Sequence, residues 1–143
     1  RDWNELDKEV KVAETLPSFS NSLDKDRLLV PKWYTVGTRK YNVLHSRLRM
    51  LCSPLNNHLF SYIHVLDSTG CSCGSAKESN RHYLSDCPLY DAQRLSLMNA
   101  LTRLDFDATL SDLLYGNSDY SYEKNCEAFK IIQAYIESTG RFD

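Results

Sequence analysis

Three cysteines and one histidine within seventeen residues are the feature that most limits how this chain can fold. Three thiolates and one imidazole fill the tetrahedral shell of a structural zinc ion and leave no position open for a substrate. Gly74 permits the tight backbone turn that would aim two neighbouring sulfurs at one point. A short helix ending at Pro88 would supply the other two ligands, which lie a little over one helical turn apart. The predicted ligands are Cys71, Cys73, His82 and Cys87.

The spacing of the first cysteine pair leaves alternatives. One residue separates Cys71 from Cys73, whereas zinc sites usually place two to four residues between such a pair. A disulfide between two of these cysteines, or a set of unrelated buried thiols, would also account for the pattern. We expect zinc, because a four-ligand set this compact rarely arises by chance.

Composition is that of a single globular domain. The chain has 143 residues, of which 42% are hydrophobic and 25% charged, so wholesale disorder is not expected. Because it begins at Arg1, we expect a fragment of a longer protein. No apolar run approaches the length of a transmembrane helix, and the first residues lack a signal-peptide pattern. We therefore expect no membrane contact.

The remaining cysteines point to a reducing compartment. Five cysteines are an odd number, which fits poorly with a fully paired secreted framework. Removing the predicted ligands leaves Cys52 and Cys126, which lie among apolar residues and are expected to be buried thiols. The expected location is intracellular, either nuclear or cytoplasmic.

Charge is distributed unevenly along the chain. Residues 27–66 contain no Asp or Glu and carry a local charge of +6, against −3 before them and −5 after them, within a net charge of −2. Such asymmetry is typical of contact with a phosphate backbone. The alternative is a solvated basic face packed against acidic segments of this chain or a partner. The predicted nucleic-acid contacts are Arg39, Lys40, His45, Arg47 and Arg49, with Trp33 and Tyr34 stacking on unpaired bases.

Helices dominate the predicted secondary structure. The best amphipathic pattern covers residues 38–52, where Tyr41, Leu44 and Leu48 share a stripe. Capping boxes at Ser75–Glu78 and Thr109–Asp112 are expected to open the helix that bears His82 and a short helix ending at Gly116. Helices are expected at residues 3–15, 16–29, 38–52, 54–65, 88–104 and 121–138, with an irregular connector at 32–37.

The predicted fold class is mainly α, a small helical domain with a zinc-stabilised Cys-Cys-His-Cys knuckle. Strand patterns are too short for a sheet beyond a two-stranded knuckle at the cysteines. We expect one domain over residues 1–143. Its expected parts are N-terminal helices and a connector (1–37), a basic helix pair (38–66), the zinc knuckle (67–94) and C-terminal helices (95–143).

Motifs that would carry catalysis are missing from the sequence. It has no Gly-rich phosphate loop, no nucleophile elbow and no His-Glu-x-x-His helix. A catalytic zinc site of the deaminase type needs a Glu beside the ligand histidine, whereas Asn80, Arg81 and Tyr83 surround His82. We therefore expect a structural metal site and no enzyme activity of this chain alone.

Several motifs follow one another along the chain, in segments 3–6, Phe19, 42–49, 52–60, 71–74, His82 and 87–94. This succession resembles the carboxy-terminal region of non-LTR (LINE-type) retrotransposon reverse transcriptases. In that family a helix pair precedes a Cys/Cys/His/Cys knuckle, and Cys-Pro-x-Tyr and an arginine follow. The resemblance covers residues 3–94 and thins out afterwards.

The resemblance implies a zinc-binding segment that follows a polymerase thumb and helps to hold template RNA or target DNA. Its zinc ligands would be Cys71, Cys73, His82 and Cys87. The parent protein would be an RNA-directed DNA polymerase, although the polymerase aspartate motif is not in this chain. The expected partners are RNA or DNA and the polymerase portion of that parent. The alternative is a structural or protein–protein interaction zinc module, domesticated in a host protein and without nucleic-acid binding.

Overall fold

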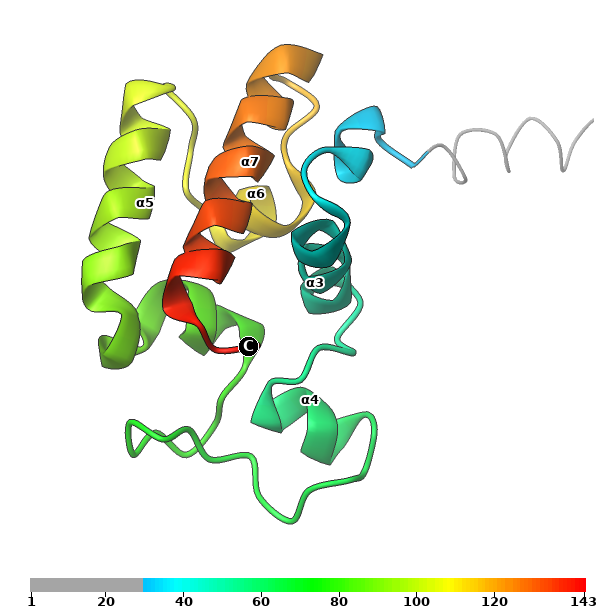
Figure 1. Ribbon diagram of the computed structural model, residues 1–143, viewed down its shortest axis with the longest axis vertical. Helices are drawn as coiled ribbons and strands as arrows, with labels where there is room; N and C mark the ends of the chain where they lie inside the picture. Colours follow the sequence, from blue (N-terminus) through cyan, green and yellow to red (C-terminus); the bar gives the residue numbers. More distant parts are fainter. Residues whose placement is uncertain (1–29) are drawn as a thin grey trace, which may run out of the picture. The chain divides into compact units, whose positions relative to one another are not determined.

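The computed structural model describes residues 30–143, and within them every element of secondary structure is helical (Figure 1). Two short 3-10 helices, η1 and η3, and one π turn, η2, accompany five α-helices. The predicted mainly α fold is confirmed, while the helices predicted at residues 3–15 and 16–29 lie outside the described residues. The elements are η1 (Lys32–Thr35), α3 (Arg39–Arg49), α4 (Asn56–Ser61), η2 (His82–Asp86), η3 (Pro88–Tyr90), α5 (Asp91–Arg103), α6 (Leu110–Tyr115) and α7 (Tyr122–Thr139).

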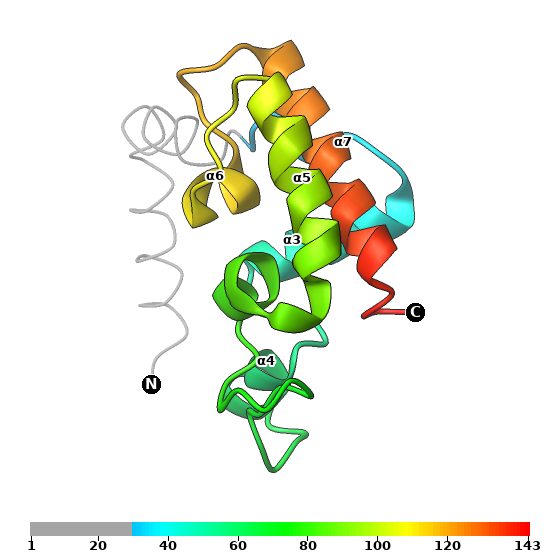
Figure 2. The same cartoon turned by 90° about the vertical axis from the view of Figure 1, so that its left-hand side faces the viewer.

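Helix α7 is the element around which the others pack. The Ser121 hydroxyl accepts a hydrogen bond from the amide three residues on and caps the first turn. Gly140, in the left-handed conformation with φ +61°, ends the helix. The buried side carries Phe129, Ile132 and Ile136, and the helix contacts α3, α5, α6 and η1. Figure 2 shows α5 running alongside α7.

Local capping signals locate the neighbouring helices correctly. Thr109 Oγ1 accepts a hydrogen bond from the amide of Asp112 at 3.2 Å, and Gly116 ends α6, as predicted. The helical stretch predicted from Pro88 is also confirmed, divided between η3 and α5, with Leu97 and Leu101 buried. In α3, Leu44 and Leu48 are buried against the rest of the core.

Two segments differ from the prediction, one in type and one in extent. Residues 32–37 contain the 3-10 helix η1, where an irregular connector was predicted. Helix α4 covers only the six residues Asn56–Ser61 of the predicted 54–65, and a turn follows it. The amides of Tyr62 and Ile63 both donate to the carbonyl of His58, and His64 is left-handed with φ +63°. Tyr62 is consequently exposed.

The knuckle (residues 67–94) is built from turns. The capping box predicted at Ser75 is wrong. The serine that caps this segment is Ser79, whose hydroxyl accepts a hydrogen bond from the amide of His82 at 3.2 Å. The two-stranded knuckle is also wrong, because no strand occurs among residues 30–143. The cysteines lie so close in sequence that the chain between Cys71 and Gly74 closes on itself in a turn, with 3.0 Å between the Gly74 nitrogen and the Cys71 oxygen.

Candidate metal centre

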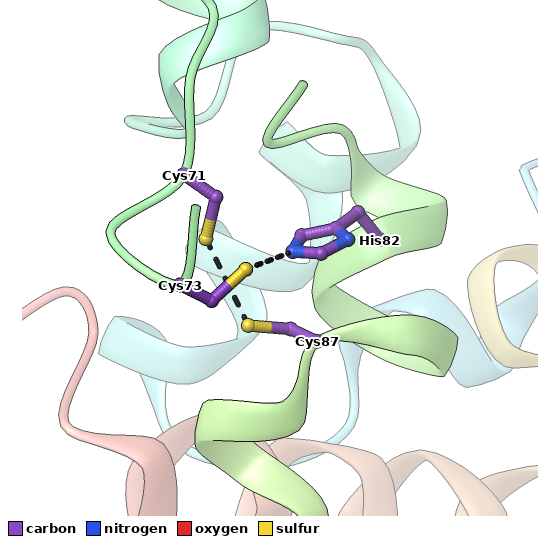
Figure 3. A group of neighbouring side chains, drawn as sticks. All are labelled: Cys71, Cys73, His82 and Cys87. Atoms are coloured by element: carbon purple, nitrogen blue, oxygen red, sulfur yellow. Dashed lines mark hydrogen bonds between the residues drawn. The ribbon is translucent and has the colours of Figure 1, made fainter. Parts of the chain in front are cut away.

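Cys71 and Cys73 lie on one tight turn. The amide of Cys71 donates to the carbonyl of Ser75 at 2.9 Å, which closes the turn around the intervening residues. Gly74 has φ +98°, a backbone conformation that residues with a side chain rarely adopt. A Cβ atom placed on Gly74 would meet no atom within 4 Å. Backbone conformation therefore explains the glycine. Figure 3 shows that the turn aims both sulfurs toward the same space.

His82 begins the π turn η2, and Cys87 directly follows its last residue. On an α-helix, residues five apart stand about 140° apart around the axis and face different sides. Here the amide of Cys87 donates to the carbonyl of His82 at 2.7 Å, an i→i+5 bond that brings the two residues back together. The short helix predicted to end at Pro88 is therefore a π turn, and this is why it supplies two ligands to one point.

The four side chains converge closely enough to hold one metal ion. One donor atom from each side chain lies within 4.8 Å of all the others. Cys71 Sγ lies 3.8 Å from Cys87 Sγ, and Cys73 Sγ lies 3.3 Å from His82 Nε2 (Figure 3). A tetrahedral site with zinc–sulfur bonds of about 2.3 Å has sulfur–sulfur edges of about 3.8 Å. The sulfur separation thus equals the edge of such a site.

The two alternative interpretations of the cysteines do not describe this geometry. The Cys71 and Cys87 sulfurs are much farther apart than the roughly 2.05 Å of a disulfide bond, and all five cysteines are free thiols. Unrelated buried thiols would not converge on a histidine. Cys126 is such a thiol, buried in α7 as predicted, whereas Cys52 is only half-buried.

The pKa values of two ligand thiols are shifted in opposite directions. Burial raises the pKa of the Cys87 thiol to about 12, and the Leu89 amide opposes this rise. The Ser75 amide lies 3.4 Å from Cys73 Sγ and lowers the pKa of that thiol. A divalent cation stabilises every thiolate it binds, so it would offset the cost of ionising the buried sulfur.

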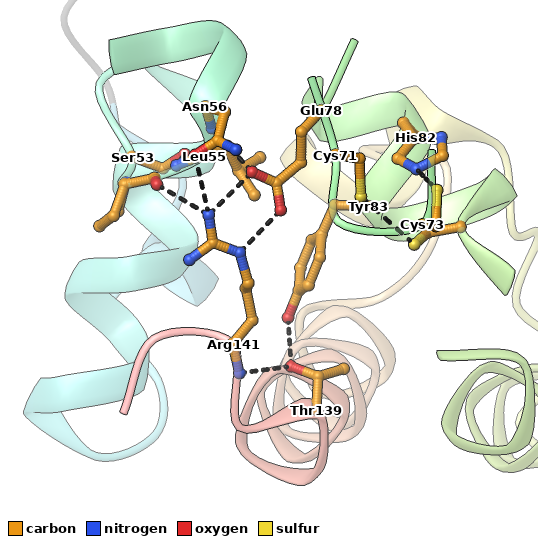
Figure 4. Close-up of polar contacts among 12 residues, drawn as sticks. Ser53, Leu55, Asn56, Cys71, Cys73, Glu78, His82, Tyr83, Thr139 and Arg141 are labelled. Atoms are coloured by element: carbon orange, nitrogen blue, oxygen red, sulfur yellow. Dashed lines mark hydrogen bonds and ion pairs between the residues drawn. The ribbon is translucent and has the colours of Figure 1, made fainter. Parts of the chain in front are cut away.

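A buried ion pair anchors the cysteine turn to the rest of the domain (Figure 4). The Glu78 side chain is 3% exposed and pairs through both oxygens with Arg141, with Nε–Oε1 and Nη2–Oε2 distances of 2.7 and 2.8 Å. Glu78 Oε2 also accepts the amide of Asn56 at 2.8 Å, at the start of α4. This carboxylate raises the pKa of Arg141. The contact joins the knuckle to α4 and to the residues that follow α7.

An aromatic cluster holds the π turn against the core. Tyr83 is fully buried, its ring centre lies 5.3–5.5 Å from those of Tyr90, Tyr135 and Phe142, and burial raises its pKa. Its hydroxyl lies 2.7 Å from that of Thr139, at the end of α7 (Figure 4). These contacts fix the segment that carries His82 and Cys87 to the helical core. The Glu78 contacts fix the segment that carries Cys71 and Cys73 to α4.

Three of the residues predicted to bind nucleic acid lie on an exposed side of α3: Arg39, Lys40 and Arg47. Lys40 pairs with Asp143 across 3.1 Å, and this hydrogen bond raises the pKa of Lys40. Within residues 30–143, no ion pair joins Arg39 or Arg47 to an acid.

The other four residues use their polar groups or rings in contacts within the described residues, and the burial of Arg49 and His45 contradicts the predicted nucleic-acid contacts of these two. Arg49 is buried and donates to the carbonyl of Leu114 at 2.9 Å. His45 is 1% exposed, with Nε2 2.7 Å from the carbonyl of Leu113, and burial lowers its pKa to about 3. Trp33 Nε1 donates to the carbonyl of Tyr115 at 3.0 Å.

The fourth of these residues, Tyr34, has its ring covered on the inside of the domain. It stacks on Phe129 with 5.7 Å between the ring centres and 12° between the planes. The Arg49 guanidinium also lies 4.0 Å from the centre of the Tyr34 ring. Tyr34 therefore contributes to the packing of η1 on α7.

Sequence reasoning missed the residues that support the ligands. Glu78 was assigned to a helix cap, and Arg141 carried no signal because the two residues are 63 positions apart. The uneven charge along the sequence located a group of cations on α3, but it could not tell which of them are exposed and which are buried.

Comparison of the chain with protein-family models, curated proteins and solved structures gives no match. In residues 30–143, no helix has both the length and the apolar character required to cross a membrane.

Proposed function

We propose that Cys71, Cys73, His82 and Cys87 bind one structural zinc ion, and that the domain it staples binds RNA or DNA through the exposed side of α3. The first half of this proposal is supported by the donor set. Thiolate and imidazole ligands favour zinc over magnesium and calcium, which prefer oxygen ligands. Four protein ligands leave no open coordination position, so the ion would stabilise the fold and would not carry out a reaction.

Metal analysis of the purified domain tests the zinc proposal. We expect one equivalent of zinc per chain, and a chelator should lower the melting temperature sharply, because forming such a site is coupled to folding. Adding zinc back should restore the melting temperature, whereas magnesium should not. A domain that melts at the same temperature with and without chelator would disprove a structural metal.

The second half is supported by Arg39, Lys40 and Arg47. All three are exposed on one helix, in a segment that has no acidic residue between positions 27 and 66. Cations grouped in this way contact consecutive phosphates without reading sequence. The resemblance to the region after a retrotransposon polymerase thumb agrees with this role and suggests an accessory domain that holds template RNA or target DNA.

A salt titration tests binding. Three phosphate contacts predict a slope of log affinity against log salt of about −2 for a single strand and about −3 for a duplex. Charge reversal at Arg39, Lys40 and Arg47 together should abolish binding to RNA and DNA oligonucleotides. The matched control reverses three exposed cations elsewhere, Lys77, Arg103 and Lys130, and should retain most of the affinity. Equal losses in both variants would argue against an interface on α3.

A protein-interaction module is the second candidate, and one surface favours it. Residues 50–66 contain no Lys, Arg, Asp or Glu. A phosphate backbone would find no cation here, so the matching partner is an apolar protein surface, such as the polymerase portion of a parent protein. Several large apolar side chains of this segment are exposed: Met50, Phe60, Tyr62, Ile63, Val65 and Leu66.

The two candidates differ in one experiment. An interaction module would form a complex with the polymerase portion in the absence of nucleic acid, and the double variant Tyr62→Ser/Val65→Ser should disrupt that complex. The control double variant Leu89→Ser/Leu95→Ser changes two exposed leucines, one before α5 and one on it, and should leave the complex intact. The same module would ignore the charge reversals on α3. Salt-sensitive nucleic-acid binding that survives the Tyr62 and Val65 substitutions would support the first candidate.

A further inference from the structure

The π turn is the part of the centre that depends most on outside support. It is a single turn of a rare geometry, and the ladder of an ordinary α-helix does not continue on its C-terminal side, where Cys87 has extended backbone angles. Carbonyl groups at such an end lack partners within the turn and need donors from elsewhere. Without those donors the chain could relax to an α-helical turn, in which His82 and Cys87 would face different sides.

Arg94, on α5, supplies those donors. Its Nη2 donates to the carbonyls of Cys87 at 2.8 Å and Tyr83 at 3.4 Å, and its Nε donates to the carbonyl of Leu84 at 3.2 Å. The remaining nitrogen, Nη1, donates to Asp91 Oδ1 at 2.7 Å, which fixes the guanidinium plane. The Arg94 side chain is only 11% exposed, so these bonds are shielded from water.

A second contact supports the same backbone from α7. The hydroxyl of Tyr135 donates to the carbonyl of Tyr83 at 2.6 Å, and this hydroxyl is buried. The turn is thus held from two helices. Of these two side chains, only Arg94 contacts the backbone of Cys87, a predicted ligand, whose carbonyl also accepts a hydrogen bond from the amide of Tyr90 at 3.3 Å. The planar, five-donor guanidinium suits this task, since a lysine ammonium could not span three carbonyls.

We infer that Arg94 is a positioning residue for the metal centre: it holds the π turn in the geometry that presents His82 and Cys87 to one ion. This inference rests on the proposed zinc site. Outer contacts that orient metal ligands typically change metal affinity by about 10- to 100-fold when they are removed. Arg94 contacts no ligand side chain and acts through the backbone that carries the ligands.

Cobalt substitution separates positioning from general stability. The spectrum of Co²⁺ bound to thiolate and imidazole depends on coordination geometry, so at saturation it reports the arrangement of the ligands. Arg94→Met should lower zinc affinity, measured by competition with a chelator, by about 10- to 100-fold and should change the saturated Co²⁺ spectrum. Arg94→Lys, which keeps the charge but not the fork, should fall between this variant and the wild type.

Two controls calibrate the result. Arg103→Met removes the same charge from an exposed position on α5 and should match the wild type. Tyr83→Phe removes the hydroxyl contact with Thr139 and should lower the melting temperature while leaving the saturated spectrum unchanged.

The outcomes separate this inference from the zinc proposal. If Arg94→Met gives the wild-type spectrum and loses no more affinity than Tyr83→Phe, Arg94 serves stability alone and the inference is wrong. If Arg94→Met does not fold even with metal, Arg94→Lys decides by the same two readouts. A wild-type domain that binds neither Zn²⁺ nor Co²⁺ would overturn the zinc proposal itself, and this inference with it.

Discussion

The guanidinium of Arg49 lies 4.0 Å from the centre of the Tyr34 ring and 5.5 Å from the centre of the Phe129 ring. Its Nη1 donates to the carbonyl of Leu114, and its Nη2 donates to the hydroxyl of Ser46 at 2.8 Å. This one side chain therefore joins α3 to η1, α6 and α7. A cation used in this way stabilises the core and is not available to a phosphate.

Arg49→Met should accordingly destabilise the domain by about 2–4 kcal/mol, through lost cation–π contacts and a buried carbonyl left without a donor. Arg47→Met, two residues earlier and exposed, should change the free energy of unfolding by less than about 0.5 kcal/mol. Urea denaturation of both variants measures the difference. Equal stabilities would contradict the core role of Arg49.

The sequence could not distinguish Arg47 from Arg49. Both lie in the acid-free segment, and the pattern of α3 places Arg49 on a polar stripe with Arg39 and Asn42. Arg49 is nevertheless buried, because the rings of Tyr34 and Phe129 and the carbonyl of Leu114, all distant in sequence, make favourable contacts with its guanidinium. Only the tertiary arrangement of η1, α6 and α7 reveals this.

Local signals predicted more than distant ones. The cap at Thr109, the end of α6 at Gly116 and the ligand set of the metal centre depend on residues within a few turns of one another. The π turn was missed because an α-helix and a π turn share the same residue preferences over five positions. The support given by Glu78 was missed because its partner, Arg141, follows α7.

Breaking the Glu78–Arg141 pair should be costly. Glu78→Gln removes the charge from a side chain that is 3% exposed, while Arg141 remains with a quarter of its side chain exposed to water. We expect a loss of about 3 kcal/mol, at the lower end for a broken buried ion pair. Thermal or urea unfolding of Glu78→Gln, Arg141→Met and the double variant gives the coupling energy. Purely additive losses would show that the two residues act independently.

His45 should make the domain sensitive to acid. Burial lowers its pKa from 6.5 to about 3, so between these values the unfolded chain binds a proton that the folded chain does not. Stability is therefore fully present above pH 6.5 and is lost as the pH falls, by about 2 kcal/mol between pH 7 and pH 5 for this group. Nearby Arg49 lowers the pKa further, and the Leu113 carbonyl opposes the shift.

His45→Gln isolates this contribution, because glutamine keeps an N–H donor but does not titrate. The variant should be less stable than the wild type at pH 7, and the gap should narrow by about 2 kcal/mol at pH 5. Acid also releases metal from thiolate ligands, but it does so in both proteins and cancels in the difference. A gap that is constant with pH would show that His45 titrates normally.

Replacing a metal ligand should have a larger effect than replacing a cysteine outside the set. Cys87→Ser keeps the size of a fully buried side chain but loses the thiolate, so zinc retention and cooperative unfolding should both be lost. Cys52→Ser changes a half-buried thiol outside the set and should retain one zinc and the wild-type melting temperature. Retention of zinc by the Cys87 variant would exclude the four-ligand assignment.

Asp143 should weaken nucleic-acid binding by competing for Lys40. The two charges are 3.1 Å apart, and both side chains are more than half exposed, so the pair is easily separated. Asp143→Asn frees Lys40 without altering α3, and affinity for an RNA or DNA oligonucleotide should rise by roughly twofold to fivefold at low salt. The increase should shrink as salt is added, because screening weakens contacts to phosphate. In a Lys40→Gln background the same substitution should have no comparable effect, since the competing pair no longer exists. A similar increase in that background would mean that Asp143 acts through general repulsion and that Lys40 is not part of the interface.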